Sequence, residues 1–150
     1  MSLQERLAED VKNAMRQHDD VRRDTLRMVR SAVRYEEINQ QKPLDDAGVI
    51  NVLAKMARQH QESIAEFTRG NRPEMVKKEE AELVIVRSYM PQQLTREELA
   101  ELARKAIAEV GAKGPQDMSK VMGKMMPQVR GKADGNAVSQ VVRELLAAAS

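Results

Sequence analysis

The stretch YMPQQLTREE (Tyr89–Glu98) divides this chain of 150 residues into two parts. Pro91 has no amide hydrogen and restricts the residue before it, so a helix that reaches Tyr89 is predicted to end there. Thr95 followed by Glu98 is a capping-box sequence, which predicts that a new helix begins at once. We therefore expect one domain over residues 1–90, a linker over residues 91–94 and a second domain over residues 95–150.

On both sides of this boundary apolar residues recur at intervals of three and four, and no segment rich in Val, Ile and Thr alternates with a period of two. The pattern predicts an all-α protein, with an N-terminal four-helix bundle-like domain followed by a small three-helix domain. The predicted helices cover about residues 2–17, 20–41, 45–69, 71–89, 95–110, 116–127 and 134–148. Asp45 and Asp134 are the expected N-caps, Gly70 the expected stop of the third helix, and Pro127 with Gly131 the expected end of the sixth. In the first helix the predicted buried residues are Leu3, Leu7, Val11, Ala14 and Met15.

The composition limits the classes of function. The 25 Lys and Arg residues nearly balance 23 Asp and Glu, so a strongly basic nucleic-acid protein is excluded while a local basic patch is not. The absence of cysteine removes disulfides and thiolate chemistry. The charged N-terminus and the lack of a long apolar run predict a cytoplasmic protein with no membrane segment. The chain has only three aromatic residues, and this scarcity argues against a protein that recognises single-stranded bases by stacking.

The predicted sixth helix has two different faces. At helical spacing its apolar residues fall on one side, which we interpret as core: Met118, Val121, Met122, Met125, Met126 and Val129. Ser119, Lys120, Gly123 and Lys124 fall on the other side. With Lys113, Arg130 and Lys132, this segment holds five basic residues against the single acid Asp117. The polar side is either an ordinary solvated face or an anion-binding platform, with Gly123 permitting close approach of a phosphate.

A second basic row lies in the second predicted helix, where Arg23, Arg27, Arg30 and Arg34 share one side. We place it opposite an apolar set made of Val21, Met28, Val29, Ala32 and Tyr35. Such a row could hold phosphates, but pairing with neighbouring acids is the favoured interpretation.

Enzyme motifs are missing from the sequence: it has no Gly-rich phosphate loop, no G-x-G-x-x-G and no H-E-x-x-H. His18 lies at a helix break and His60 in a polar stretch, so both are expected to be exposed. The pairs Asp45–Asp46 and Glu79–Glu80 are interpreted as cap and surface. We therefore expect no catalytic residue, no metal site and no cofactor.

Four segments together resemble a known family: RDTLRM (23–28), YMPQQL (89–94), DMSKVM (117–122) and GKADG (131–135). The chain is similar to stand-alone bacterial YqeY-like proteins of the GatB/YqeY family, and its C-terminal part resembles the helical tail of the B subunit of the glutamyl/aspartyl-tRNA amidotransferase. Related modules are appended to some glutaminyl-tRNA synthetases. The resemblance implies a two-part helical fold, with tRNA as the partner and amidotransferase or aminoacyl-tRNA synthetase components as further partners.

From the residues and the resemblance, the leading hypothesis is a non-catalytic tRNA-binding module associated with tRNA-dependent amidation. Its expected contacts are Lys113, Lys120, Gly123, Lys124, Arg130 and Lys132, with the arginine row of residues 23, 27, 30 and 34 as the secondary candidate. One alternative is a component of an amidotransferase, with carbon–nitrogen ligase activity that uses glutamine as the amido donor. Another is a helical adapter whose Met-rich surface binds a protein.

Overall fold

The structure is a computed structural model that describes residues 1–149. Within those residues it contains seven α-helices, one short 3-10 helix and no strand, which confirms the all-α prediction. The internal contacts divide the chain into two compact units, the first Met1–Met90 and the second beginning at Pro91. That each unit folds as a domain of its own stays a prediction.

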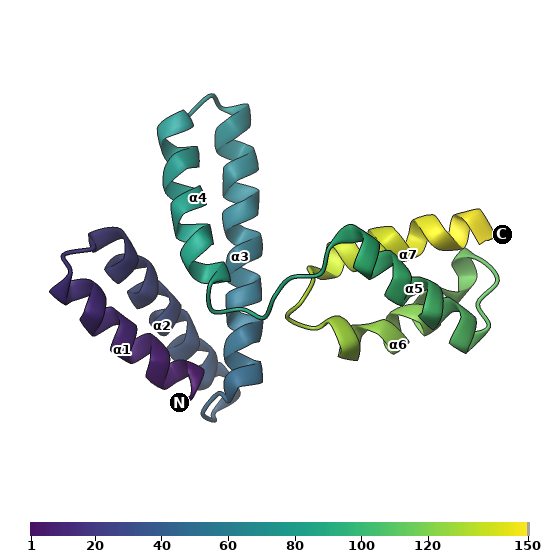
Figure 1. The fold of residues 1–150 in the computed structure, drawn as a ribbon, viewed down its shortest axis with the longest axis horizontal. Helices are drawn as coiled ribbons and strands as arrows, with labels where there is room; N and C mark the ends of the chain where they lie inside the picture. The colour runs from purple at the N-terminus through teal and green to yellow at the C-terminus, as the bar shows by residue number, and fades with distance from the viewer. Residues whose placement is uncertain (150) are drawn as a thin grey trace. The chain divides into compact units, whose positions relative to one another are not determined.

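Two helical hairpins form the first unit (Figure 1). In one, α1 (Leu3–Arg16) packs along α2 (Asp20–Gln40), and in the other α3 (Asp46–Arg69) packs along α4 (Pro73–Arg87). Because α2 also contacts α3 and α4, the two hairpins share one hydrophobic core. Its fully buried side chains are Leu7, Leu26, Val29, Val49, Leu53 and Val86.

Side chains at the helix ends explain where these helices begin. Ser2, Asp19 and Asp45 each accept a hydrogen bond from the backbone N–H three residues further on, which satisfies a donor that has no partner inside the helix. The prediction of Asp45 as an N-cap is therefore confirmed, as is the end of α3 at Gly70. Pro73 occupies the first turn of α4, where its missing N–H costs no helical bond.

The prediction that Met15 is buried is wrong, and the apolar set opposite the arginine row is only partly buried. Met15 is 49% exposed, because α1 buries only the stripe Leu7, Val11 and Ala14 against its neighbours. The apolar set predicted for α2 is split: Val29 is buried and Ala32 is half-buried, whereas Val21, Met28 and Tyr35 are exposed. The residues that α2 buries are Thr25, Leu26, Val29 and Val33.

Three helices form the second unit: α5 (Arg96–Val110), α6 (Met118–Val129) and α7 (Gly135–Ala149), with the 3-10 turn η1 (Pro115–Asp117) before α6. Helix α5 packs against both α6 and α7, and the buried side chains include Leu99, Ala103, Val121, Met125, Val138, Val142 and Leu146. The predicted cap at Thr95 is confirmed, since its hydroxyl accepts from Glu98 N at 3.1 Å. The amide N–H of Leu94 donates to the carbonyl of Lys132 at 2.8 Å, so the last residue of the predicted linker is bonded to the loop between α6 and α7.

The sequence predicted that Pro127 helps to end α6, and this is wrong. Pro127 lies inside the helix, which continues to Val129. A proline at this position removes the N–H that would bond the carbonyl of Gly123, and Gly123 is exposed, so the loss falls on a group that water can reach. The chain turns at Gly131, whose φ of 80° lies in the left-handed region. None of the helices in residues 1–149 is long and apolar enough to cross a membrane.

Candidate functional site

The polar side of α6 faces solvent. Lys120, Gly123 and Lys124 are all exposed, while the helix buries Val121, Met125 and Val129 against α5 and α7. Met118, Met122 and Met126 are half-buried and pack against the same core, so the interpretation of the methionines as core is confirmed. The sequence therefore predicted the two faces of this helix correctly.

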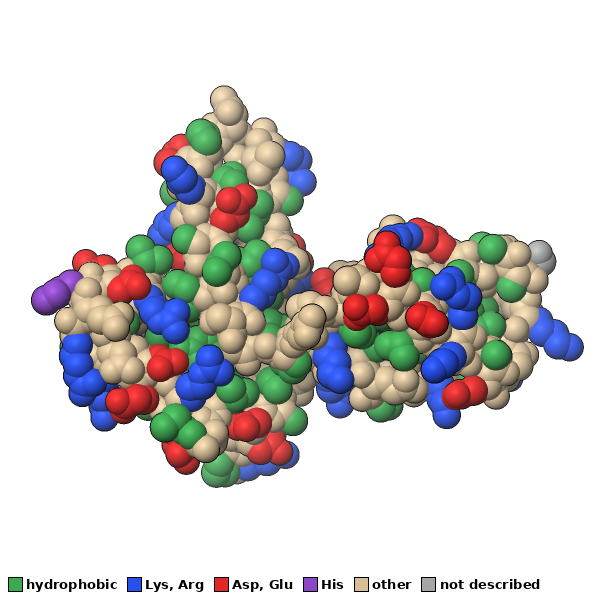
Figure 2. Space-filling view, viewed as in Figure 1, with side chains coloured by type: hydrophobic (Ala, Val, Ile, Leu, Met, Phe, Trp, Pro, Cys, Tyr) green, Lys and Arg blue, Asp and Glu red, His purple; other side chains and the backbone are tan. Residues whose placement is uncertain are grey.

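Two lysines of this face have acidic neighbours. Lys120 Nζ lies 3.8 Å from Asp117 Oδ1, and Lys124 Nζ lies 3.2 Å from Glu109 Oε2 on α5. The Lys124–Glu109 pair joins side chains that are 47% and 55% exposed, and Lys120 is 70% exposed, so solvent screens these pairs and each contributes little to stability. The visible face of the molecule likewise shows basic side chains interspersed with acidic ones (Figure 2).

The other predicted basic residues lie in the loops at the two ends of α6. Lys113 precedes the helix, and its backbone N–H donates to Asp117 Oδ2 at 2.9 Å. Arg130 and Lys132 follow the helix and are exposed, and neither side chain pairs with an acid within residues 1–149. The six predicted residues thus extend along a helix of 12 residues, about 18 Å long, and its two flanking loops. We call this set (Lys113, Lys120, Gly123, Lys124, Arg130 and Lys132) the α6 basic segment.

Nothing inside the protein requires a glycine at position 123. A Cβ atom built there would meet no atom within 4 Å other than its chain neighbours and the nearby backbone of its own helix, and the helix is right-handed through this residue. Glycine costs an exposed helix interior about 1 kcal/mol relative to alanine. Gly123 therefore leaves an open, side-chain-free position between two lysines.

The arginine row of α2 has several local partners. Arg23 contacts Asp24 at 2.9 Å and Asp20 at 3.0 Å; the hydrogen bond to Asp24 raises the pKa of Arg23 and lowers that of Asp24. Arg27 donates to Met15 Sδ at 3.5 Å. Arg30 and Arg34 line a cavity of about 60 Å³ together with Gln4 and Glu37. Only Arg23 in this row shows the predicted pairing with acids among the bridges of residues 1–149.

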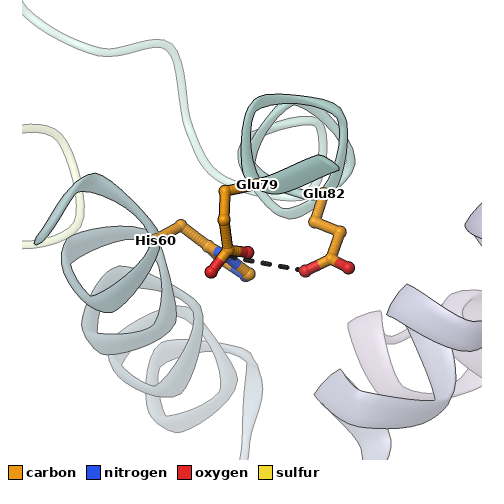
Figure 3. Close-up of side chains that lie close together, drawn as sticks. All are labelled: His60, Glu79 and Glu82. Atoms are coloured by element: carbon orange, nitrogen blue, oxygen red, sulfur yellow. Dashed lines mark hydrogen bonds and ion pairs between the residues drawn. The ribbon is translucent and has the colours of Figure 1, made fainter. Parts of the chain in front are cut away.

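A second cluster was missed by the sequence analysis. His60, expected to be exposed, is 7% exposed and therefore buried; its Nδ1 lies 3.1 Å from Glu79 Oε2 and 3.7 Å from Glu82 Oε2. Figure 3 shows the ring of His60 pointing from α3 toward the two glutamates on α4. Burial raises the pKa of Glu82, and the neighbouring Glu79 raises it further. Glu79 is half-buried, so its interpretation as a surface residue is also wrong.

The burial of this cluster had a signal in the sequence. His60 follows Met56 by four residues and precedes Ile64 by four, so it lies on the inward stripe of α3. Glu82 precedes Val86 by four residues in the same way on α4. The polar neighbours of His60, RQHQE over residues 58–62, hid this spacing.

Comparison with known proteins identifies the family to which this chain is similar. A family model described as Yqey-like protein matches residues 4–146. Among curated proteins, "Altered inheritance of mitochondria protein 41, mitochondrial" of Eremothecium gossypii is 32% identical over 148 residues, which cover 95% of this chain and 80% of that protein. The protein of the same name from Pyrenophora tritici-repentis is 27% identical over 146 residues, with the same coverage. That from Lachancea thermotolerans is 37% identical over 87 residues, and this match spans only 46% of that protein's length.

These names correct two expectations. The relatives are proteins named as mitochondrial, and mitochondria belong to eukaryotic cells, which contradicts both the cytoplasmic location and the bacterial source expected from the sequence. The family resemblance itself is confirmed by a match that covers nearly the whole chain. The chain belongs to the YqeY-like protein family.

Proposed function

We propose that this protein is a non-catalytic tRNA-binding module that holds its RNA on the α6 basic segment. The observation that supports it is the exposure of Lys120, Gly123 and Lys124 on one helix face, while the reverse side packs against the core of the second unit. A face that the fold leaves to solvent, basic and open at its centre, suits the phosphate backbone of a nucleic acid.

The aromatic residues indicate what kind of RNA recognition is available. Tyr89 is 3% exposed and Phe67 is half-buried, so Tyr35 is the one aromatic ring with most of its surface in solvent. Proteins that read single-stranded bases stack them on several exposed rings. We infer recognition of folded tRNA by shape and phosphate contacts.

The link to amidation rests on the resemblance to the amidotransferase tail. In this proposal the module holds tRNA for amidotransferase or aminoacyl-tRNA synthetase components and supplies no reacting group itself. Glutamine-dependent amidation of Glu-tRNA(Gln), measured with the catalytic subunits in the presence and absence of this protein, tests that link. A rate that does not change removes the link to amidation but leaves tRNA binding in place. Amidation by this protein alone, without the catalytic subunits, would instead favour an activity of its own.

The structure gives little support to the alternative function of a helical adapter that binds a protein through a Met-rich surface. This function needs the methionines of α6 on the surface, whereas Met125 is 1% exposed and the other three pack against the core of the second unit.

The decisive experiment is filter binding of total tRNA to the full chain at two salt concentrations. We expect Lys120→Ala/Lys124→Ala to bind about tenfold more weakly at low salt, and the slope of log K against log salt to fall by about 1.5 because two phosphate contacts are lost. The matched control is Arg27→Ala/Arg34→Ala, which removes the same charge from α2. Equal binding by the lysine variant and the parent contradicts the proposal, and a loss confined to the control moves the contact to the arginine row.

A further inference from the structure

We propose that His60, Glu79 and Glu82 form a binding site for one divalent transition-metal ion. Zn²⁺ is the ion that we expect to bind, and it is the ion used in the test below. The site belongs to the hairpin of α3 and α4 in the first unit and is independent of the α6 basic segment. It is built from one imidazole and two carboxylates, a set of donors that Zn²⁺ and its neighbours in the first transition row bind well.

The distances fit a single ion. One ligand atom from each of the three side chains can be chosen so that all three lie within 4.8 Å of one another. Ligands about 2.1 Å from a metal lie roughly 3.0–3.5 Å apart in octahedral or tetrahedral geometry. The separations of 3.1 Å and 3.7 Å from His60 Nδ1 to the two carboxylates are already close to that range. The two carboxylate ligand atoms lie within 4.8 Å of each other, so side-chain rotation would bring all three atoms into that range.

The helices hold the ligands in place. Glu79 and Glu82 are separated by three residues on α4 and therefore lie on one side of it, facing α3. His60, Glu79 and Glu82 have side chains only 8%, 17% and 11% exposed. Ligands fixed on two packed helices lose little freedom when an ion binds, which favours affinity.

The electrostatics explain why a cation belongs there. Hydrogen bonding to His60 requires one carboxylate, yet the fold brings a second to the same imidazole. Two ionised carboxylates held this close repel each other, and the pKa of Glu82 is accordingly raised, first by burial and then by Glu79. His60 and Lys78 are the positive groups that oppose this rise. A divalent ion would relieve the same repulsion at neutral pH.

Binding is then an exchange of protons for metal. Any proton carried by a ligand atom leaves to solvent when the ion binds, because the metal takes the lone pair of a deprotonated carboxylate or imidazole nitrogen. Affinity should therefore be lower in acid, where protons compete with the metal for the ligand atoms. Three protein ligands leave at least one coordination position for water.

The test compares two histidine variants of the full chain after treatment with EDTA and removal of the chelator. The chain has only two histidines, so His18→Gln, at an exposed position, is the matched control for His60→Gln. Calorimetric titration with ZnCl₂ at pH 7.5 should show one site in the parent and in His18→Gln. It should show at least tenfold weaker binding in His60→Gln and in Glu82→Gln, with Mg²⁺ binding more weakly than Zn²⁺ throughout.

Imidazole NMR spectra keep the test valid if a variant fails to fold. With two histidines there are two sets of ring resonances, and Zn²⁺ should shift the set that His18→Gln retains. Absence of binding by the parent at 100 µM Zn²⁺, retention of full affinity in both His60→Gln and Glu82→Gln, or a shift confined to the ring of His18 would each overturn the proposal.

Discussion

The hydroxyl of Tyr89 donates a hydrogen bond of 2.5 Å to the carboxylate of Asp10, which lies 79 residues earlier in the chain. Arg22 donates to the same hydroxyl at 3.1 Å, and the guanidinium of Arg6 lies 4.5 Å from the centre of the ring. Burial, followed by the bond to Asp10, raises the pKa of Tyr89 to about 12. One side chain after the end of α4 thus connects α1, α2 and α4.

We expect Tyr89→Phe to lower the free energy of unfolding by about 1–2 kcal/mol, because the half-buried side chains of Asp10 and Arg22 lose the hydroxyl that both of them contact. Urea unfolding followed by circular dichroism measures the change. Tyr35→Phe is the control, since Tyr35 is 67% exposed and its removal should shift stability by less than about 0.5 kcal/mol. With Tyr35 replaced, absorbance at high pH reports on Tyr89 alone and should give a pKa of about 12. A pKa of 10 there would contradict the hydrogen bond and burial described above.

Glu82→Gln should stabilise the metal-free protein. Since the pKa of Glu82 is raised in the folded state, the folded chain holds a proton that the unfolded chain has lost once the pH exceeds the unfolded value. The free energy of unfolding therefore falls as the pH rises from about 4.5 through the folded pKa. Glutamine removes this fall, so we expect the variant to be more stable than the parent at pH 7 and about as stable as the parent at pH 4.

Thermal unfolding in EDTA over that pH range is the measurement, and Glu80→Gln, at an exposed neighbour, is its control. A variant less stable than the parent at pH 7 in EDTA would show that Glu82 is favourably ionised. With saturating Zn²⁺ the order should reverse, because the parent gains binding energy that the variant lacks.

Two glycines of the second unit should respond oppositely to alanine. Gly123→Ala should raise stability by up to about 1 kcal/mol, since the position is helical and open. Gly131→Ala should lower it by about 1–2 kcal/mol, because a φ of 80° is strained for any residue with a Cβ. Denaturant unfolding of both variants checks the pair.

The same Gly123→Ala variant also separates fold from function. If the gap between Lys120 and Lys124 admits a phosphate, the variant should bind tRNA more weakly while being more stable. Unchanged tRNA affinity would remove any role for Gly123 in the contact.

Periodicity in the sequence was sufficient to predict all seven helices to within a few residues. Local signals marked their ends, such as Asp45 as a cap and the turn after Arg69, and these depend on groups close in sequence. The path of α6 through Pro127 was mispredicted, because the cost of the missing bond depends on whether Gly123 reaches water, a property of the folded surface.

The burial and pairing of side chains were predicted less well where they depend on contacts between helices. Met15 and Met28 lie at positions that fit an apolar stripe, but the packing of the first unit leaves both near half exposed. His60 shows the opposite error, since its polar neighbours suggested solvent whereas α4 supplies it with two carboxylates. For the α6 basic segment, the exposure of the lysines followed from helical spacing, while the pairing of Lys124 with Glu109 needed the packing of α5.

The position of Tyr89 also has a consequence for the order of folding. The hairpins α1–α2 and α3–α4 join residues that are close in sequence, and such contacts form early. The partners of Tyr89 lie 67 and 79 residues before it, so a growing polypeptide cannot close this link until almost the whole first unit has left the ribosome. Synthesis halted shortly before this residue would leave two helical hairpins without their final connection, and the nascent chain would be exposed to proteases until Tyr89 emerges.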